Sequence, residues 1–371
     1  MQRPVLNILA IISRTLLALT FLFSGIVKAI DPLGTVYKIE DYLKAFGGVF
    51  TDLLPLATAG AFCLIIAEWL LGVCLLFNIR ASVTSWLTLL FYLIMTPLTL
   101  YIAINNPVSD CGCFGDAIVL TNWQTFYKNI ALLTLTILFV ATHRFTHRTF
   151  MWHAELGITT VALTAVLTLM IWTLNHLPLI DFRPYKIGNH LPTLMEYPDD
   201  AEPDQYDISF VYEKDGVEQT FTLDNYPNGD SAWTFVRQNS VLIKKGYEPP
   251  IHDFEITTAD YDDITYDILE SETPVTLAVM YDLNKSDLRQ LPKLSALYKS
   301  CQSRGEQFYI LTGSGTDDII GLSLNNDAAD LQDVICSCDP VTLKTIVRAN
   351  PGIIVVQNGT VIDKYNLKNR D

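Results

Sequence analysis

Two cysteines separated by one residue, Cys111 and Cys113, are the side chains of this sequence best suited to chemistry. They flank Gly112 in the acidic stretch Asp110–Asp116, which lies between two strongly apolar segments. A disulfide between cysteines so close in sequence closes a small, strained ring, and strain makes a disulfide easier to reduce. Glycine at the middle position relieves the backbone of such a ring. The pattern favours a dithiol/disulfide couple that passes electrons; the alternative is a static local link.

Zinc is the other common use of paired cysteines. A zinc site needs four nitrogen or sulfur ligands, or an open catalytic set. The polar stretches 31–56 and 105–122 around the apolar segments contain no histidine. We therefore expect no metal site at this pair.

Composition divides the chain into two unlike halves. Hydrophobic residues make up 50% of the 371 residues, which is high for a soluble protein. Residues 1–180 hold 9 Lys/Arg and 8 Asp/Glu, whereas residues 181–371 hold 16 and 32. An apolar, nearly neutral half is thus joined to an acidic, water-soluble half. The acidic charge argues against nucleic acid as a partner, because a phosphate-binding surface needs a basic patch.

The apolar half predicts five membrane-spanning helices, since a span needs about 20 mostly apolar residues. The first carries Arg14 and Lys28 and lacks a small-residue cleavage site, so we expect a retained helix rather than a signal peptide. The predicted spans are Val5–Ile30, Ala57–Phe77, Ala81–Ile104, Trp123–Val140 and Leu156–Leu174.

Basic residues set the expected orientation. The loop His143–Arg148, the turn Asn78–Arg80 and Arg3 are cationic, and such loops stay in the cytoplasm. The N-terminus is then cytoplasmic, and everything after the fifth span lies outside. In a bacterial inner membrane that side is the periplasm, where disulfides are permitted. The cysteine pair and the acidic half are expected to share it.

Two ionisable residues fall within the predicted spans, Arg14 in the first and Glu68 in the second. Charges inside a membrane usually face the bundle interior in pairs. One hypothesis is an Arg14–Glu68 pair, or a polar pocket that they form for a head group. The other is that Arg14 extends to the inner membrane surface.

At these residues the sequence resembles a known family. Phe23–Pro32 and Ala67–Gly72 resemble the first two helices of DoxX-like membrane proteins. Asp110–Gly115 is similar to the loop of the MauE branch, which is linked to methylamine utilisation. The resemblance covers roughly residues 5–142. It implies a four-helix membrane protein of extracytoplasmic thiol redox chemistry, with a quinone as candidate electron partner and a thioredoxin-like domain or another envelope protein as client.

The acidic half predicts a linker with a small β-containing part, followed by an α/β unit. Asp215-Gly216 separates two alternating runs, which is typical of a hairpin. Asn358-Gly359 lies between the last two expected strands and predicts a second hairpin. Asp339-Pro340 predicts a helix start, with Asp as the cap and Pro in the first turn. The expected strands of the α/β unit are 274–281, 307–311, 330–335, 352–356 and 361–365, with helices at 287–304, 317–324 and 339–348.

This second part resembles the TlpA-like branch of the thioredoxin fold. The resemblance rests on His252–Ile256, Leu291–Leu294 and Asn350–Val356, and it implies that Pro351 is cis. The family's Cys-x-x-Cys should follow the first strand, where this chain has Tyr281–Ser286 and no cysteine. Standard thioredoxin chemistry is therefore excluded for this domain.

Cys336 and Cys338 are the paired thiols that remain in the acidic half. They lie at the end of a predicted strand, just before a helix N-terminus, which would lower a thiol's pKa. They are a candidate second redox pair; the alternatives are buried packing or a static disulfide.

The fold class we expect is a multidomain membrane protein, an all-α bundle followed by a periplasmic α/β thioredoxin-like domain. The expected domains are 1–150 for four helices, 151–177 for the fifth, 178–248 for the linker and β part, and 249–371 for the thioredoxin-like domain. Transport of a small solute through the bundle is disfavoured, because few polar residues within the spans line a path. Two other functions remain open. One is thiol/disulfide redox through Cys111 and Cys113. The other is a non-enzymatic, membrane-anchored binding or assembly module.

Overall fold

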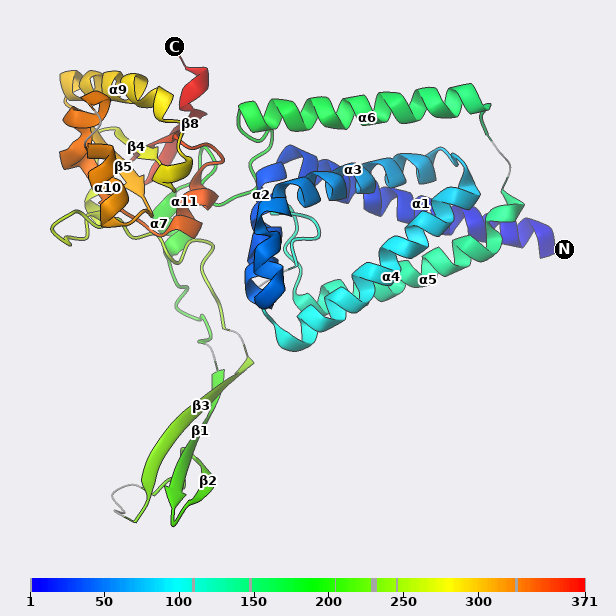
Figure 1. The fold of residues 1–371 in the computed structure, drawn as a ribbon, viewed down its shortest axis with the longest axis horizontal. Coiled ribbons are helices and arrows are strands. Elements are labelled where there is room, and N and C mark those ends of the chain that lie inside the picture. The colour runs from blue at the N-terminus through cyan, green and yellow to red at the C-terminus, as the bar shows by residue number, and fades with distance from the viewer. Residues whose placement is uncertain are drawn as a thin grey trace.

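A computed structural model describes residues 2–108, 111–146, 149–203, 205–227, 232–244, 246–323 and 326–370. Asp110 of the cysteine stretch and His147 and Arg148 of the basic loop lie outside these ranges. The described part contains five helices long and apolar enough to cross a membrane, so the expected number of spans is confirmed. They are α1 (Gln2–Ile30), α3 (Ala57–Leu76), α4 (Ala81–Asn105), α5 (Asn122–Thr142) and α6 (Trp152–Asn175) (Figure 1).

Helix α1 packs closely against α3 because each helix has a glycine at the contact. A Cβ atom on Gly25 would lie 2.9 Å from the backbone nitrogen of Trp69, and one on Gly72 would lie 2.8 Å from that of Leu22. Small residues let helix backbones approach in membranes, where packing rather than the hydrophobic effect drives association. Helix α6 joins this pair through Trp69, whose indole nitrogen donates to the carbonyl of Ala162 at 2.9 Å.

A Gly25→Ala substitution is expected to destabilise the bundle by about 1–3 kcal/mol, because the added methyl group meets backbone that cannot move aside. The matched control is Gly60→Ala in α3, where nothing lies within 4 Å of the added Cβ. Alanine there is expected to be neutral or mildly stabilising, since it favours helix over glycine. Unfolding by denaturant in detergent micelles measures both variants. Equal stability of the two variants would contradict the close approach.

Helix α2 (Pro32–Phe46) lies in the stretch 31–56, where the sequence predicts a polar connection between spans. Asp31 caps it by accepting a hydrogen bond from the backbone nitrogen of Gly34 at 3.1 Å, and Pro32 occupies the first turn. The chain then continues through the 3₁₀ segment η1 (Gly48–Leu56) into α3. Figure 1 shows α2 lying across one end of the bundle, on the side of the α/β part. This helix supplies one wall of the site described below.

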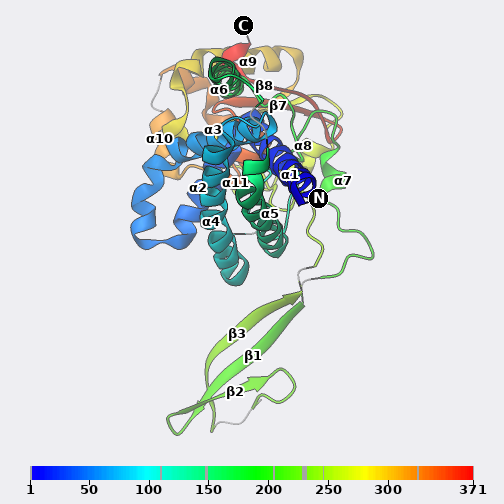
Figure 2. The same ribbon diagram turned by 90° about the vertical axis from the view of Figure 1, so that its right-hand side faces the viewer.

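The predicted β-containing part is a separate three-stranded antiparallel sheet with the order β2-β1-β3. Asp215 and Gly216 both have positive φ, 53° and 78°, so the predicted hairpin is confirmed. The sheet projects away from the rest of the molecule (Figure 2). Its strands are β1 (Gln205–Lys214), β2 (Val217–Thr222) and β3 (Thr234–Lys244).

The α/β part is built on a five-stranded mixed sheet with the order β6-β5-β4-β7-β8. Strands β4, β5 and β6 are parallel, and β7 and β8 form the predicted antiparallel hairpin at Asn358-Gly359. The prediction of a strand at 330–335 was wrong, because that stretch is mostly 3₁₀ helix and the strand starts only at Ile335. The bounds are β4 (Val275–Val279), β5 (Gln307–Thr312), β6 (Ile335–Ser337), β7 (Gly352–Gln357) and β8 (Thr360–Asn366).

Helices cover both faces of this sheet, as expected for three layers. Alternate residues of β4 enter two different cores: Val275, Leu277 and Val279 pack with α8 and α11, and Ala278 packs with α9. The remaining elements are η2 (His143–Phe145), α7 (Leu191–Met195), α8 (Thr265–Leu269), η3 (Leu283–Lys285), η4 (Leu288–Gln290), α9 (Leu291–Arg304), α10 (Thr316–Ser323), η5 (Asn326–Val334), α11 (Pro340–Ile346) and η6 (Leu367–Asn369).

Candidate redox site

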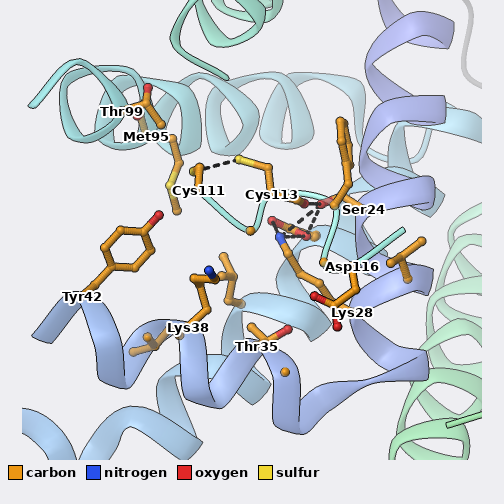
Figure 3. A pocket seen from close by; sticks show the side chains of 18 of the residues that line it. Ser24, Lys28, Thr35, Lys38, Tyr42, Met95, Thr99, Cys111, Cys113 and Asp116 are labelled. Carbon is orange, nitrogen blue, oxygen red and sulfur yellow. Dashed lines mark hydrogen bonds and ion pairs between the residues drawn. The ribbon is translucent and has the colours of Figure 1, made fainter. Parts of the chain in front are cut away.

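The two cysteines of the loop between α4 and α5 face each other. Their Sγ atoms lie 3.1 Å apart, and both side chains are half-buried (Figure 3). Gly112 between them has a φ of 63°, a conformation that favours glycine. A Cβ on Gly112 would also lie 2.9 Å from Cγ of Lys38, so α2 packs directly on the loop. The backbone thus holds the thiols within reach of each other in their reduced form.

The surroundings of the two thiols are not equivalent. The hydrogen bond from Cys111 lowers the pKa of Cys113, and the cations Lys128 and Lys28 lower it further against the opposing effect of burial. The same hydrogen bond, together with burial, raises the pKa of Cys111. The thiolate is the reactive form of cysteine. The surroundings therefore favour the thiolate at Cys113 and the protonated thiol at Cys111.

A buried ion pair inside the bundle is connected to this loop. The ammonium of Lys28 contacts both carboxylate oxygens of Glu68, at 2.7 and 2.8 Å. Ser24 lies between this pair and the loop, with its hydroxyl 2.8 Å from Glu68 and 2.7 Å from the carbonyl oxygen of Cys113. Charges within a membrane are costly and mark functional positions. This network fixes Cys113 from inside the membrane part.

The hypothesis of an Arg14–Glu68 pair was wrong. The guanidinium of Arg14 donates instead to the carbonyls of Leu75 and Leu76, at 2.9 and 3.1 Å, near the opposite end of α3. The reason is helix geometry: Arg14 lies 14 residues before Lys28 on α1, about 21 Å away along the helix axis. Glu68 pairs instead with Lys28, at 2.7 Å.

A Lys28→Met substitution is expected to destabilise the bundle by about 3–5 kcal/mol, because it leaves the Glu68 carboxylate buried without its partner. The double variant Lys28→Met/Glu68→Met is expected to regain most of that loss, since similar apolar side chains replace a buried pair well. The measurement is denaturant unfolding in micelles, with the exposed Lys44→Met as control. A double variant as unstable as the single one would disprove the pairing.

A cavity of about 320 Å³ opens beside the thiols within the bundle. Figure 3 shows Lys38 and Tyr42 of α2 on one side of the cysteine pair and Met95 and Thr99 of α4 on the other. Most of its lining is apolar. The lining also includes both cysteines and the polar residues Ser24, Lys28, Asp31, Glu68, Asp116, Lys128, Asn129 and Arg183.

Sequence reasoning missed three of the cations and hydroxyls around the thiols, Lys38, Tyr42 and Lys128. The first two lie on α2, and a signal for that helix was present. Asp31-Pro32 repeats the Asp-Pro helix start that was recognised at Asp339-Pro340 and confirmed there. Lys128 lies near the start of α5, and its ammonium sits 4.3 Å from the ring centroid of Phe114. Its nearness to Cys113 depends on how the loop folds back onto α5, which the sequence alone does not indicate.

The α/β part contacts the bundle at this same loop. Arg348 is only 8% exposed and reaches two carboxylates of the membrane half, Asp31 at 2.8 Å and Asp116 at 3.3 Å. Asp31 therefore has two roles, since its other oxygen caps α2. A second contact joins the hydroxyls of Tyr37 and Tyr281 at 3.2 Å. Asp116 is the last residue of the cysteine stretch, so one arginine links that stretch to the α/β part.

Pro351 and the second cysteine pair lie in the α/β part. The Asn350–Pro351 peptide bond is cis, as the sequence resemblance implied. Cys336 and Cys338 are both buried in the core on the α8 and α11 side of the sheet. Burial raises the pKa of Cys336 to about 11, and burial with the nearby Asp339 raises that of Cys338 to about 12. The expected lowering by the helix N-terminus is not found, and neither thiol lines the cavity beside Cys111 and Cys113.

Comparison with known proteins yields two family matches. Residues 6–142 match the model described as Methylamine utilisation protein MauE, in agreement with the resemblance at the cysteine stretch. Residues 206–245, which hold β2, β3 and all of β1 except Gln205, match a domain of unknown function, DUF8463. No curated protein and no solved structure matches the chain. Residues 6–142, which hold most of α1 and all of α2 to α5, are thus similar to MauE, and neither family match reaches the α/β part.

Proposed function

We propose that this chain is an integral inner-membrane protein of extracytoplasmic thiol/disulfide redox chemistry. Its working group is the Cys111/Cys113 pair, which exchanges two electrons with a dithiol or disulfide of an envelope protein client. The observation that carries the proposal is the geometry of the pair: the two Sγ atoms lie 3.1 Å apart, in surroundings that lower the pKa of Cys113 and raise that of Cys111. Strongly shifted pKa values of this kind are typical of functional sites.

The chemistry is an ordinary thiol–disulfide exchange. When the pair is reduced, the Cys113 thiolate attacks a client disulfide, forms a mixed disulfide and releases one client thiolate, which takes up a proton. Cys111 then loses its proton, attacks Sγ of Cys113 and releases the second client thiolate, which takes up that proton. The client gains two electrons and two protons and the pair becomes a disulfide. The reverse sequence oxidises a client dithiol.

The α/β part has a supporting role in this proposal. Its strand order and its cis Pro351 agree with the resemblance to TlpA-like thioredoxin folds. The stretch Tyr281–Ser286 has no cysteine, and Cys336 and Cys338 have raised pKa values. We therefore assign the electron transfer to Cys111 and Cys113, and we assign to the α/β part the task of holding or presenting the client. We propose that this part lies in the periplasm, because cationic loops stay in the cytoplasm and those of this chain lie on the other side of the bundle.

A second candidate function is a non-enzymatic binding or assembly module. It is favoured by the ion pairs of Arg348, which hold the α/β part against the bundle, as expected for a binding module held in one orientation on a membrane anchor. The two functions differ in their need for the thiols. In the module, Cys111 and Cys113 would form only a local link.

A Cys111→Ser/Cys113→Ser variant separates the two functions. Purified, reduced protein is mixed with an oxidised model peptide, and the release of peptide thiols is followed. We expect the double variant to lose this exchange, whereas the control Cys63→Ser/Cys74→Ser, which changes two cysteines within α3, keeps it. Exchange that persists at the wild-type rate without Cys111 and Cys113 would refute the redox function and favour the module.

A further inference from the structure

The cavity beside the thiols has a shape and position that identify its ligand. It is lined by Thr20 and Asp31 on or next to α1, and by Phe91 and Ile102 on α4. Each of these pairs is separated by 11 residues, which corresponds to about 16 Å along a helix. The hydrocarbon core of a bilayer is about 30 Å thick. The cavity therefore extends from the cysteine loop to about the middle of the membrane.

The two ends of the cavity differ in chemistry. At the loop end lie the thiols, Lys128 and Tyr42. At the deep end lies a cluster of aromatic rings, with Phe21 centred 5.0 Å from Phe91 and 5.5 Å from Tyr92. A ligand that fits has a small polar ring for the loop end and a hydrocarbon chain for the deep end. A water-soluble client fits only the loop surface.

The cysteine pair also needs a second electron partner if it is to turn over. Within the described residues, the other paired thiols, Cys336 and Cys338, are buried in another core and do not line this cavity. A partner that occupies the cavity must be soluble in the membrane and must accept two electrons. We propose that the cavity binds a quinone, with its ring beside Cys113 and its chain directed toward Phe21. This inference rests on the proposed redox function.

The transfer step balances in atoms and electrons. The Cys113 thiolate adds to the quinone ring and forms a carbon–sulfur bond. Cys111 then gives up its proton and attacks Sγ of Cys113, so the sulfur–sulfur bond forms and the carbon–sulfur bond breaks. The electron pair remains on the ring, which takes the Cys111 proton and one proton from water to become the quinol. The ammonium of Lys128 stabilises both anions, first the Cys113 thiolate and then the oxygen of the reduced ring.

The test is a single turnover in lipid nanodiscs with decyl-benzoquinone as the probe. Reduced wild-type protein is expected to lose two thiols for each quinol formed. Met95→Trp fills the cavity next to the pair and is expected to slow this reaction at least tenfold. The control Leu93→Trp lies on the same helix at an exposed position outside the cavity and is expected to react like the wild type.

A parallel reaction with oxidised glutathione separates this inference from the proposed function. Met95→Trp should still react with glutathione, which shows that the variant is folded, and its quinone rate should fall at least tenfold more than its glutathione rate. If wild-type protein reacts with glutathione but not with the quinone, the quinone site is refuted and the cavity holds a lipid chain. If it reacts with neither, the redox function itself fails. Equal slowing by both tryptophans would also overturn the site.

Discussion

A Cys111→Ser variant is expected to trap clients as mixed disulfides on Cys113, whereas Cys113→Ser is expected to trap none. The lowered pKa of Cys113 makes it the attacking thiolate, and the raised pKa of Cys111 suits the thiol that resolves the intermediate. Serine at position 111 removes the resolving thiol but keeps a hydroxyl that can donate to Cys113. Trapped complexes are measured by non-reducing electrophoresis and identified by mass spectrometry.

The pH dependence of alkylation tests the cause of this asymmetry. Because the pKa of Cys113 is lowered, its thiolate persists below the usual thiol value of about 8.5 and is lost only as the pH falls through the lowered pKa. Cys111→Ala removes the donor, so the alkylation profile of Cys113 should move to higher pH. A profile that moves by about one pH unit leaves roughly tenfold less thiolate at pH values well below the pKa of Cys113. Cys111→Ser should move it less, and equal profiles for serine and alanine would show that the hydrogen bond does not set the pKa.

The second large effect is expected at Arg348. Arg348→Ala leaves the largely buried Asp31 without its cation, and loss of one partner of a buried pair costs about 3–5 kcal/mol. Asp116 loses the same cation, but its side chain is 47% exposed and its loss adds little. The contact between the α/β part and the bundle should therefore open. Hydrogen exchange of α2 and of the segment 178–183, which lines the cavity, is expected to rise. Arg348→Lys should restore only part of the protection, because lysine lacks the forked geometry of arginine.

Arg289→Ala is the matched control for Arg348. Arg289 belongs to the same α/β part and also pairs with a carboxylate, Asp287 at 2.7 Å, but its side chain is 86% exposed. Exposed ion pairs contribute little, so the hydrogen exchange of α2 should stay at the wild-type level. If Arg348→Ala and Arg289→Ala behave alike, Arg348 does not hold the two parts together.

The membrane half could be predicted largely from the sequence because its signals are local. About 20 apolar residues in a row specify each span. In the acidic half, Asp-Gly and Asn-Gly likewise specify the two hairpins. The cysteine pair was also visible, since two thiols and one glycine are adjacent in the chain. The α2 helix was missed although Asp31-Pro32 carries a helix-start signal, because the stretch was interpreted as a connection between spans.

The partners of the thiols could not be predicted, because they come from distant parts of the chain. Lys28 and Glu68 meet only because Gly25 and Gly72 let α1 and α3 approach. Arg348 lies 232 residues after Asp116 and contacts it through the docking of the α/β part. The burial that raises the pKa of Cys336 and Cys338 likewise depends on tertiary packing, which outweighs the local effect of a helix N-terminus.

The central claim is that Cys111 and Cys113 change redox state together during function. The direct measurement is differential alkylation of intact membranes, with mass spectrometry of the peptide that contains both residues, after exposure to an oxidant and after exposure to a reductant. We predict that both thiols are alkylated after reduction and that both are protected as one disulfide after oxidation, while Cys336 and Cys338 remain thiols throughout. A Cys111/Cys113 pair locked in one state under both conditions would contradict the redox function.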